Sequence, residues 1–373
     1  MASVGFAAIT FLWFVSLSLL ICRPAVSGVT HIRLPGKHVA LFVFGDSLYD
    51  PGNNNYINTT PEYQANFRPY GKTYLRFPSG RFSDGRLIPD FISEYADLPL
   101  IPPYLKPGVS NYAYGVNFAS GGAGALIESH QGFVVDLQTQ VSYFKKVKKR
   151  LCQTLGPAKA ETLISTAVYL FSVGGNDYMS RYTADSTILD KHHKKETVGV
   201  VLGNLTQVLQ EIYNTGGRKF GFVNIPPMGC LPGIKMLKPE NNGACYDEFT
   251  SLAKLHNILL PKVLRKIHSE LQGFNYTTFD FFTSVSKIID HPSKYGFKDA
   301  SMGCCGSGPY RGVYSCGGKR GETEFELCDN VGDYFFFDSL HPSEKACKQL
   351  SKMFWSGGPD VTWPYNLEQF FEF

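Results

Sequence analysis

Several features that would point to a particular class of protein are missing from this sequence of 373 residues. Acidic and basic residues nearly balance, with a formal net charge of +4, so the composition does not indicate a nucleic-acid partner. The pattern Gly-x-Ser-x-Gly, which marks the nucleophile of the α/β-hydrolase fold, does not occur. No Cys-x-x-Cys spacing marks a zinc site. Beyond residue 21 no apolar run is long enough to cross a membrane, so we expect no transmembrane segment.

The first 27 residues have the features of a secretion signal. Residues 4–21 are almost wholly apolar, and Ala25-Val26-Ser27 is a small-residue pattern typical of a cleavage site, although no Lys or Arg precedes the apolar run. An uncleaved membrane anchor is the alternative, but Arg23 and Pro24 end the run near the lower length limit for a span. We therefore expect residues 1–27 to be a cleaved signal peptide and residues 28–373 to form a soluble, secreted protein.

Cysteines and glycosylation motifs agree with secretion. Loss of the signal peptide would remove one of the nine cysteines and leave an even number, which favours disulfides in an oxidising compartment. Four of them lie near one another in the sequence and could join the ends of a loop by disulfides in some pairing: Cys304, Cys305, Cys316 and Cys328. A zinc site formed by these cysteines is a weaker alternative. Acceptor patterns for N-glycosylation begin at Asn58, Asn204 and Asn275.

Strand-like and helix-like segments alternate along the chain. Short apolar runs predict strands at 39–43, 115–119, 168–173, 220–225 and 276–281. Apolar residues at helical spacing predict helices at 87–98, 134–151, 198–212, 249–271 and 343–354. This alternation predicts an α/β fold, a three-layer α/β/α sandwich around a five-stranded parallel sheet. We find no linker, repeat or low-complexity segment, so residues 28–373 are predicted to form a single domain.

Candidate site residues follow three of the predicted strands. Ser47 follows the first strand, Gly121-Gly122 the second and Gly175-Asn176 the third. Since the carboxyl ends of parallel strands meet at one edge of a sheet, these residues should lie together. Asp338 and His341 add an acid and an imidazole near the other end of the chain, and Ser, His and Asp are the parts of an acyl-transfer triad. Each residue alone could be a turn or cap residue, and their coincidence in order carries the hypothesis.

Four motifs in order give the chain a family resemblance: Phe44-Gly45-Asp46-Ser47, Gly115-Val116-Asn117-Phe118-Ala119-Ser120-Gly121-Gly122-Ala123-Gly124, Gly174-Gly175-Asn176-Asp177-Tyr178 and Asp338-Ser339-Leu340-His341-Pro342. With these motifs the sequence resembles the plant GDSL esterases/lipases of the SGNH-hydrolase superfamily, over the whole predicted mature chain. One departure is Phe337, since the family usually has tryptophan before the aspartate. We interpret that difference as a packing change beside the acid.

The resemblance implies a flavodoxin-like SGNH-hydrolase fold and a role for each site residue. Ser47 would be the nucleophile, His341 the general base and Asp338 the group that orients the histidine. The oxyanion hole would consist of the backbone N–H groups of Ser47 and Gly122 and the side-chain amide of Asn176. No metal and no cofactor are implied.

The function expected from this resemblance is hydrolysis of carboxylic esters of lipids or acylated plant metabolites outside the cell, in the apoplast. An acyltransferase that uses the same triad is one alternative, and a non-catalytic binding protein on the same fold is another. Among the neighbouring polar residues, Asp46 is interpreted as shaping the turn, and Asp50 and residues 53–55 as ordering a loop. The sequence gives no indication of the oligomeric state.

Overall fold

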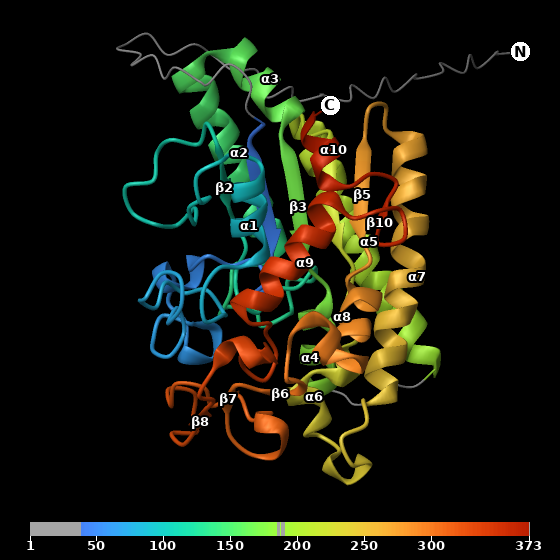
Figure 1. Cartoon of the computed structure of the whole chain (residues 1–373). Coiled ribbons are helices and arrows are strands. Elements are labelled where there is room, and N and C mark those ends of the chain that lie inside the picture. The colour runs from blue at the N-terminus through green and yellow to red at the C-terminus, as the bar shows by residue number, and fades with distance from the viewer. Residues whose placement is uncertain (1–38, 185–186, 188–190, 373) are drawn as a thin grey trace, which may run out of the picture.

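The computed structural model describes residues 39–184, 187 and 191–372 (Figure 1). The predicted signal peptide lies outside the described residues. Every predicted site residue lies within the described residues.

A mostly parallel sheet forms the centre of the molecule, with the strand order β10-β5-β4-β3-β1-β2. Its five parallel strands confirm the predicted ones: β1 (Leu41–Gly45), β2 (Gly115–Asn117), β3 (Val168–Ser172), β4 (Lys219–Val223) and β5 (Asn275–Phe279). A sixth strand, β10 (Thr362–Trp363), pairs antiparallel with β5. The sequence pattern does not predict it, because a two-residue strand is too short to show alternation.

Helices cover both faces of the sheet, which confirms the layered α/β architecture (Figure 1). One group packs on the face that carries Phe42 and Phe44: α2 (Leu137–Leu155), α3 (Pro157–Thr166), α5 (Lys191–Thr215) and α7 (Asp247–Glu270). The other group covers the opposite face: α1 (Ile88–Tyr95), α9 (Glu344–Ser356) and α10 (Leu367–Glu372). Among the helices of the described residues, none is both long and apolar enough to cross a membrane.

Several predicted boundaries differ from the observed ones by a few residues, and two of these differences have a clear local cause. Helix α5 begins at Lys191, seven residues before the apolar stripe, because its first turns carry charged residues that show no helical periodicity. Strand β5 ends at Phe279, two residues earlier than predicted, because Asp280 caps α8 (Phe281–Asp290) by accepting a hydrogen bond from the Thr283 N–H.

Aromatic side chains hold the middle of the sheet together. Two rows of rings run across β1, β3 and β4, with neighbouring centroids 5.1 to 5.5 Å apart: Phe42, Tyr169 and Phe220 in one row, and Phe44, Phe171 and Phe222 in the other. All six side chains are buried. Cross-strand aromatic pairs of this kind add to the burial energy, so the strands that carry the site have a rigid base.

Long irregular segments lie at the carboxyl edge of the sheet. Residues 53–80 form one of them, with short 3-10 turns at Asn53–Tyr56 and Pro61–Tyr63. The other is the segment 304–328, which we call the disulfide loop because Cys304–Cys328 and Cys305–Cys316 close it. Short strands run through or beside it: β6 (Asp299–Gly303), β7 (Cys305–Gly306), β8 (Glu326–Leu327) and β9 (Tyr334–Phe336). The loop predicted from the cysteine spacing is confirmed.

Candidate active site

Ser47 sits in a turn directly after β1 that several hydrogen bonds fix in place. Asp46 Oδ1 accepts from the Leu48 N–H and the Ser172 hydroxyl, both at 3.1 Å. The Gln140 amide donates to the Gly45 carbonyl and accepts from the Gly45 N–H, each at 2.9 Å. A side chain at position 45 would collide with Ser172, since a Cβ there would lie 2.0 Å from its carbonyl oxygen. The interpretation of Asp46 as a turn-shaping residue is confirmed.

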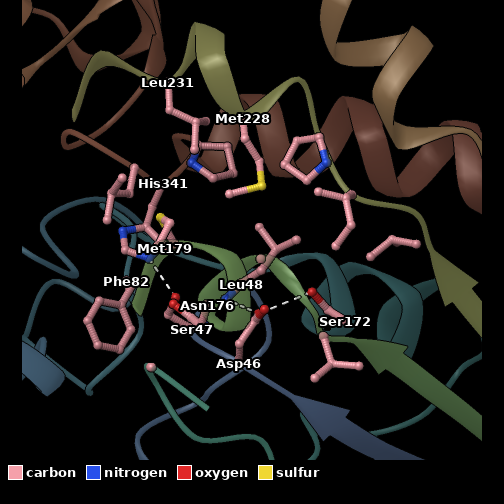
Figure 2. Close-up of a pocket in the computed structure, with 18 of the residues that line it drawn as sticks. Asp46, Ser47, Leu48, Phe82, Ser172, Asn176, Met179, Met228, Leu231 and His341 are labelled. Carbon is pink, nitrogen blue, oxygen red and sulfur yellow. Dashed lines mark hydrogen bonds between the residues drawn. The ribbon is translucent and has the colours of Figure 1, made fainter. Parts of the chain in front are cut away.

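His341 and Asp338 belong to one compact loop between β9 and α9. Asp338 Oδ1 accepts from the backbone N–H groups of Leu340 and His341, both at 2.8 Å. His341 Nδ1 lies 2.9 Å from each oxygen of the Asp338 carboxylate. Its Nε2 lies 2.7 Å from Ser47 Oγ, a contact that Figure 2 marks with a dashed line. A continuous hydrogen-bonded chain therefore joins the hydroxyl, the imidazole and the carboxylate.

The buried carboxylate of Asp338 is kept ionised by its neighbours. Burial opposes its ionisation, but the His341 imidazole, Arg320 and the Leu340 N–H together lower the pKa of Asp338 to about 2. An ionised carboxylate on Nδ1 fixes that nitrogen as the donor. Nε2 then faces Ser47 Oγ as an acceptor, which is the state that a general base needs.

Gly122 and Asn176 line the same cavity as Ser47. The Asn176 amide donates one hydrogen bond, of 3.1 Å, to the Ala123 carbonyl, which leaves its second N–H unused. Within the described part of the chain, no group accepts the backbone N–H of Ser47 or of Gly122. The structure thus brings together every residue predicted for the triad and the oxyanion hole.

Polar side chains tie the first two motifs to each other. Asp50 accepts hydrogen bonds from the backbone N–H groups of Gly52, Asn53 and Gly121 at 2.6 to 2.9 Å. The Asn54 amide donates to the carbonyls of Tyr63 and Gly121. Burial raises the pKa of Asp50 to about 6 against the effect of these donors. The interpretation of these residues as loop-ordering is confirmed.

The cavity beside Ser47 has a volume of about 310 Å³ and a mainly apolar wall. Figure 2 shows Met228 and Leu231 across the cavity from Ser47, with Met179 and Leu48 between them. Further apolar lining comes from Val173, Val223, Ile225, Pro226, Phe281, Val285, Phe335, Phe336 and Leu340. Such a wall favours an apolar group next to the serine hydroxyl.

Two further residues behind the triad escape the sequence analysis. Tyr70 donates a hydrogen bond to Asp338, and Arg320 donates one to Tyr70. Both come from irregular segments, so no periodic pattern or motif marks them.

The predicted glycosylation residues differ in exposure: Asn58 is exposed, whereas Asn204 and Asn275 are half-buried.

Comparisons with known proteins agree with this geometry. Residues 41–354 match the family model described as GDSL-like Lipase/Acylhydrolase. The chain is 47% identical to GDSL esterase/lipase 1 of Arabidopsis thaliana over 362 residues, which cover 96% of this chain and 97% of the relative. It is 51% identical to a GDSL lipase of Tanacetum cinerariifolium over 333 residues, covering 89% and 88% of the two chains. The protein therefore belongs to the GDSL-like lipase/acylhydrolase family.

Proposed function

We propose that the protein is a serine hydrolase that cleaves carboxylic esters through an acyl-enzyme on Ser47. The observation that carries the proposal is the hydrogen-bonded chain from Ser47 through His341 to Asp338 at the wall of an apolar cavity. A serine hydroxyl is a weak nucleophile unless a base is within hydrogen-bond reach, and His341 is within that reach.

In the first half of the reaction, Ser47 Oγ attacks the ester carbonyl carbon while its proton passes to His341 Nε2. The carbonyl oxygen becomes an oxyanion, for which the N–H groups of Ser47 and Gly122 and the free N–H of Asn176 are the candidate donors. The C–O bond to the alcohol then breaks, and His341 returns the proton to the departing alkoxide. The products are the free alcohol and the ester of Ser47.

The second half repeats these steps with water. His341 takes a proton from the water, the hydroxide adds to the acyl carbon, and collapse of the intermediate releases the carboxylic acid and restores Ser47. The apolar cavity supports an acyl lipid or an acylated plant metabolite as substrate. The relatives are named esterases and lipases, which supports the same class of reaction.

The proposal extends to the compartment. The predicted signal peptide and the three disulfides of the described residues support secretion into the extracellular space. Asn58, which is exposed in the segment 53–80, is the best placed of the three predicted glycosylation sites. Asn204 and Asn275 also remain proposed sites.

A series of p-nitrophenyl esters from acetyl to palmitoyl tests the function, with the wild type and Ser47→Ala compared side by side. We expect hydrolysis by the wild type and its loss in the variant, and labelling of Ser47 by a fluorophosphonate in the wild type. Added alcohol acceptors show whether the acyl group goes to water or to an alcohol. A wild type that neither turns over esters nor reacts with the fluorophosphonate would contradict the proposal.

A further inference from the structure

Tyr70 and Arg320 form a second hydrogen-bonded chain on the far side of Asp338 from the serine. The Tyr70 hydroxyl donates to Asp338 Oδ2 at 2.7 Å and accepts from Arg320 Nη1 at 2.6 Å. Tyr70 is fully buried, and Arg320 is only 6% exposed. The carboxylate of Asp338 thus contacts the imidazole of His341 on one side and the hydroxyl of Tyr70 on the other. Arg320 in turn donates a hydrogen bond to that hydroxyl.

Arg320 is fixed in its place by neutral groups. Its Nε and Nη2 donate to the carbonyls of Pro61 and Gln64. Its guanidinium lies 3.9 Å from the centroid of the Tyr314 ring and 4.9 Å from that of Tyr70. None of the ion pairs found in the described residues includes Arg320.

A buried cation without a carboxylate in contact is costly, unless a nearby anion offsets the loss of water. The nearest candidate is Asp338, one hydroxyl away through Tyr70, and Arg320 does favour the ionised form of that carboxylate. The buried positive charge of Arg320 is thus paired with the buried negative charge of Asp338, and the hydroxyl of Tyr70 lies between them.

The disulfide loop brings Arg320 to this position. Arg320 lies between Cys316 and Cys328, so both disulfides restrict the segment that carries it. Tyr70 and Phe337 pack in the same buried cluster as these cysteines, with the Tyr70 and Phe337 rings edge to face at 5.2 Å. The segment 53–80 and the disulfide loop therefore meet behind the acid of the triad.

We propose that Tyr70 and Arg320 are positioning residues that act through Asp338, by holding its carboxylate toward His341 and by drawing negative charge away from the imidazole. This inference rests on the proposed serine mechanism. It makes the disulfide loop part of the support of the active site, and it assigns to two residues outside the motifs a role in the rate of acyl transfer.

The sign of the electrostatic effect follows from the groups around the His341–Asp338 pair, which are Ser47, Asp46, Tyr70, Tyr314 and Arg320. Without the Tyr70 hydroxyl, the carboxylate keeps more negative charge toward the imidazole and stabilises its protonated form. Without Arg320, a cation that opposes this protonation is lost. Both changes move the acid limb of the rate profile to higher pH.

The experiment measures kcat, KM and the fluorophosphonate labelling rate between pH 4 and pH 9 for Tyr70→Phe, Arg320→Gln and Arg320→Lys. We expect Tyr70→Phe and Arg320→Gln to lower kcat about tenfold or more with little change in KM, since a hydrogen bond to a charged group is lost. Their acid limb should move up by about half a pH unit. Arg320→Lys keeps the charge and should leave the limb near its wild-type position.

Two matched variants separate this role from a loss of folding. Tyr169→Phe removes a buried hydroxyl from the core, and Arg311→Gln removes a guanidinium from the same disulfide loop. Both should keep the wild-type profile. The double variant Tyr70→Phe/Arg320→Gln should lose no more activity than the worse single variant, because both residues act through one carboxylate.

The outcomes distinguish this inference from the proposed function. If the wild type is active and Ser47-dependent but a folded Tyr70→Phe variant has the same kcat and the same acid limb, the inference alone is wrong. A loss of activity that only follows a fall in Tm, with no movement of the limb, also overturns it. If Ser47 of the wild type does not react with the fluorophosphonate at any pH, both proposals fail.

Discussion

Gly122 and Tyr63 lie so close together that a β-carbon at position 122 would come within 2.6 Å of the tyrosine ring. The backbone of Gly122 also has a φ of +86°, which side chains other than glycine rarely adopt. Contact and conformation thus both require glycine at the position proposed for one oxyanion donor.

Gly122→Ala should therefore displace the donor and lower kcat by about a hundredfold, the typical loss when one oxyanion donor is removed. Gly132→Ala is the matched control, because Gly132 has a φ of +85° but nothing within 4 Å of its would-be Cβ. The control should lose some thermal stability and keep its kcat. Equal losses of kcat in both variants would show that strain, not the contact with Tyr63, is responsible.

Asn176→Ala should lower kcat by about a hundred- to a thousandfold with a small effect on KM, because the donor acts on charge that develops in the transition state. Steady-state kinetics on one p-nitrophenyl ester measures this. Ser180→Ala, in the same helix α4 (Gly175–Ala184), controls for helix stability. A rise in KM with unchanged kcat would instead assign Asn176 to substrate binding.

The rate of hydrolysis should fall as the pH is lowered from neutral, because His341 must be neutral to act as base. The neighbours of Asp338 lower its pKa to about 2, so its carboxylate stays ionised down to pH 4 and adds no second step. The measurement is kcat/KM from pH 4 to pH 9 by titration of the released acid. A flat profile down to pH 4 would contradict the role of His341.

Asp46→Asn should change how stability depends on pH. Burial raises the pKa of Asp46 to about 7, so its contribution to stability is complete below about pH 4 and is lost as the pH rises through 7. Asparagine can accept the same hydrogen bonds from Leu48 and Ser172 but does not ionise. Between pH 4 and pH 8, the free energy of unfolding of the variant should therefore rise by about 4 kcal/mol relative to that of the wild type.

Urea unfolding at several pH values measures this gain, and Asp360→Asn at an exposed position controls for the change in net charge. The contrary result is that the free energies of unfolding of Asp46→Asn and the wild type differ by the same amount at every pH. That result would show that Asp46 ionises as easily in the folded as in the unfolded chain.

The sequence predicts the sheet and the triad because both leave short-range marks. Strands β1, β3 and β4 are continuous apolar runs, and Ser47, Asn176 and His341 stand in motifs of four to ten residues. Tyr70 and Arg320 leave no such mark. Their contacts with Asp338 and with each other join irregular segments 268 and 250 residues apart, and only the folded chain brings these together. The short strands of the disulfide loop are equally invisible, because two residues show no period.

The hydrogen bond between Ser47 and His341 spans 294 positions of the chain. Ser47 follows the first strand and is made early in synthesis, whereas His341 comes after all five parallel strands. A growing chain therefore has its hydroxyl long before it has a base to activate it. Contacts between such distant residues also form late in folding, after the helices and local turns. The reactivity of the serine thus reports that the chain has been made at least as far as His341 and has folded, since no piece that ends before this residue contains both halves of the site.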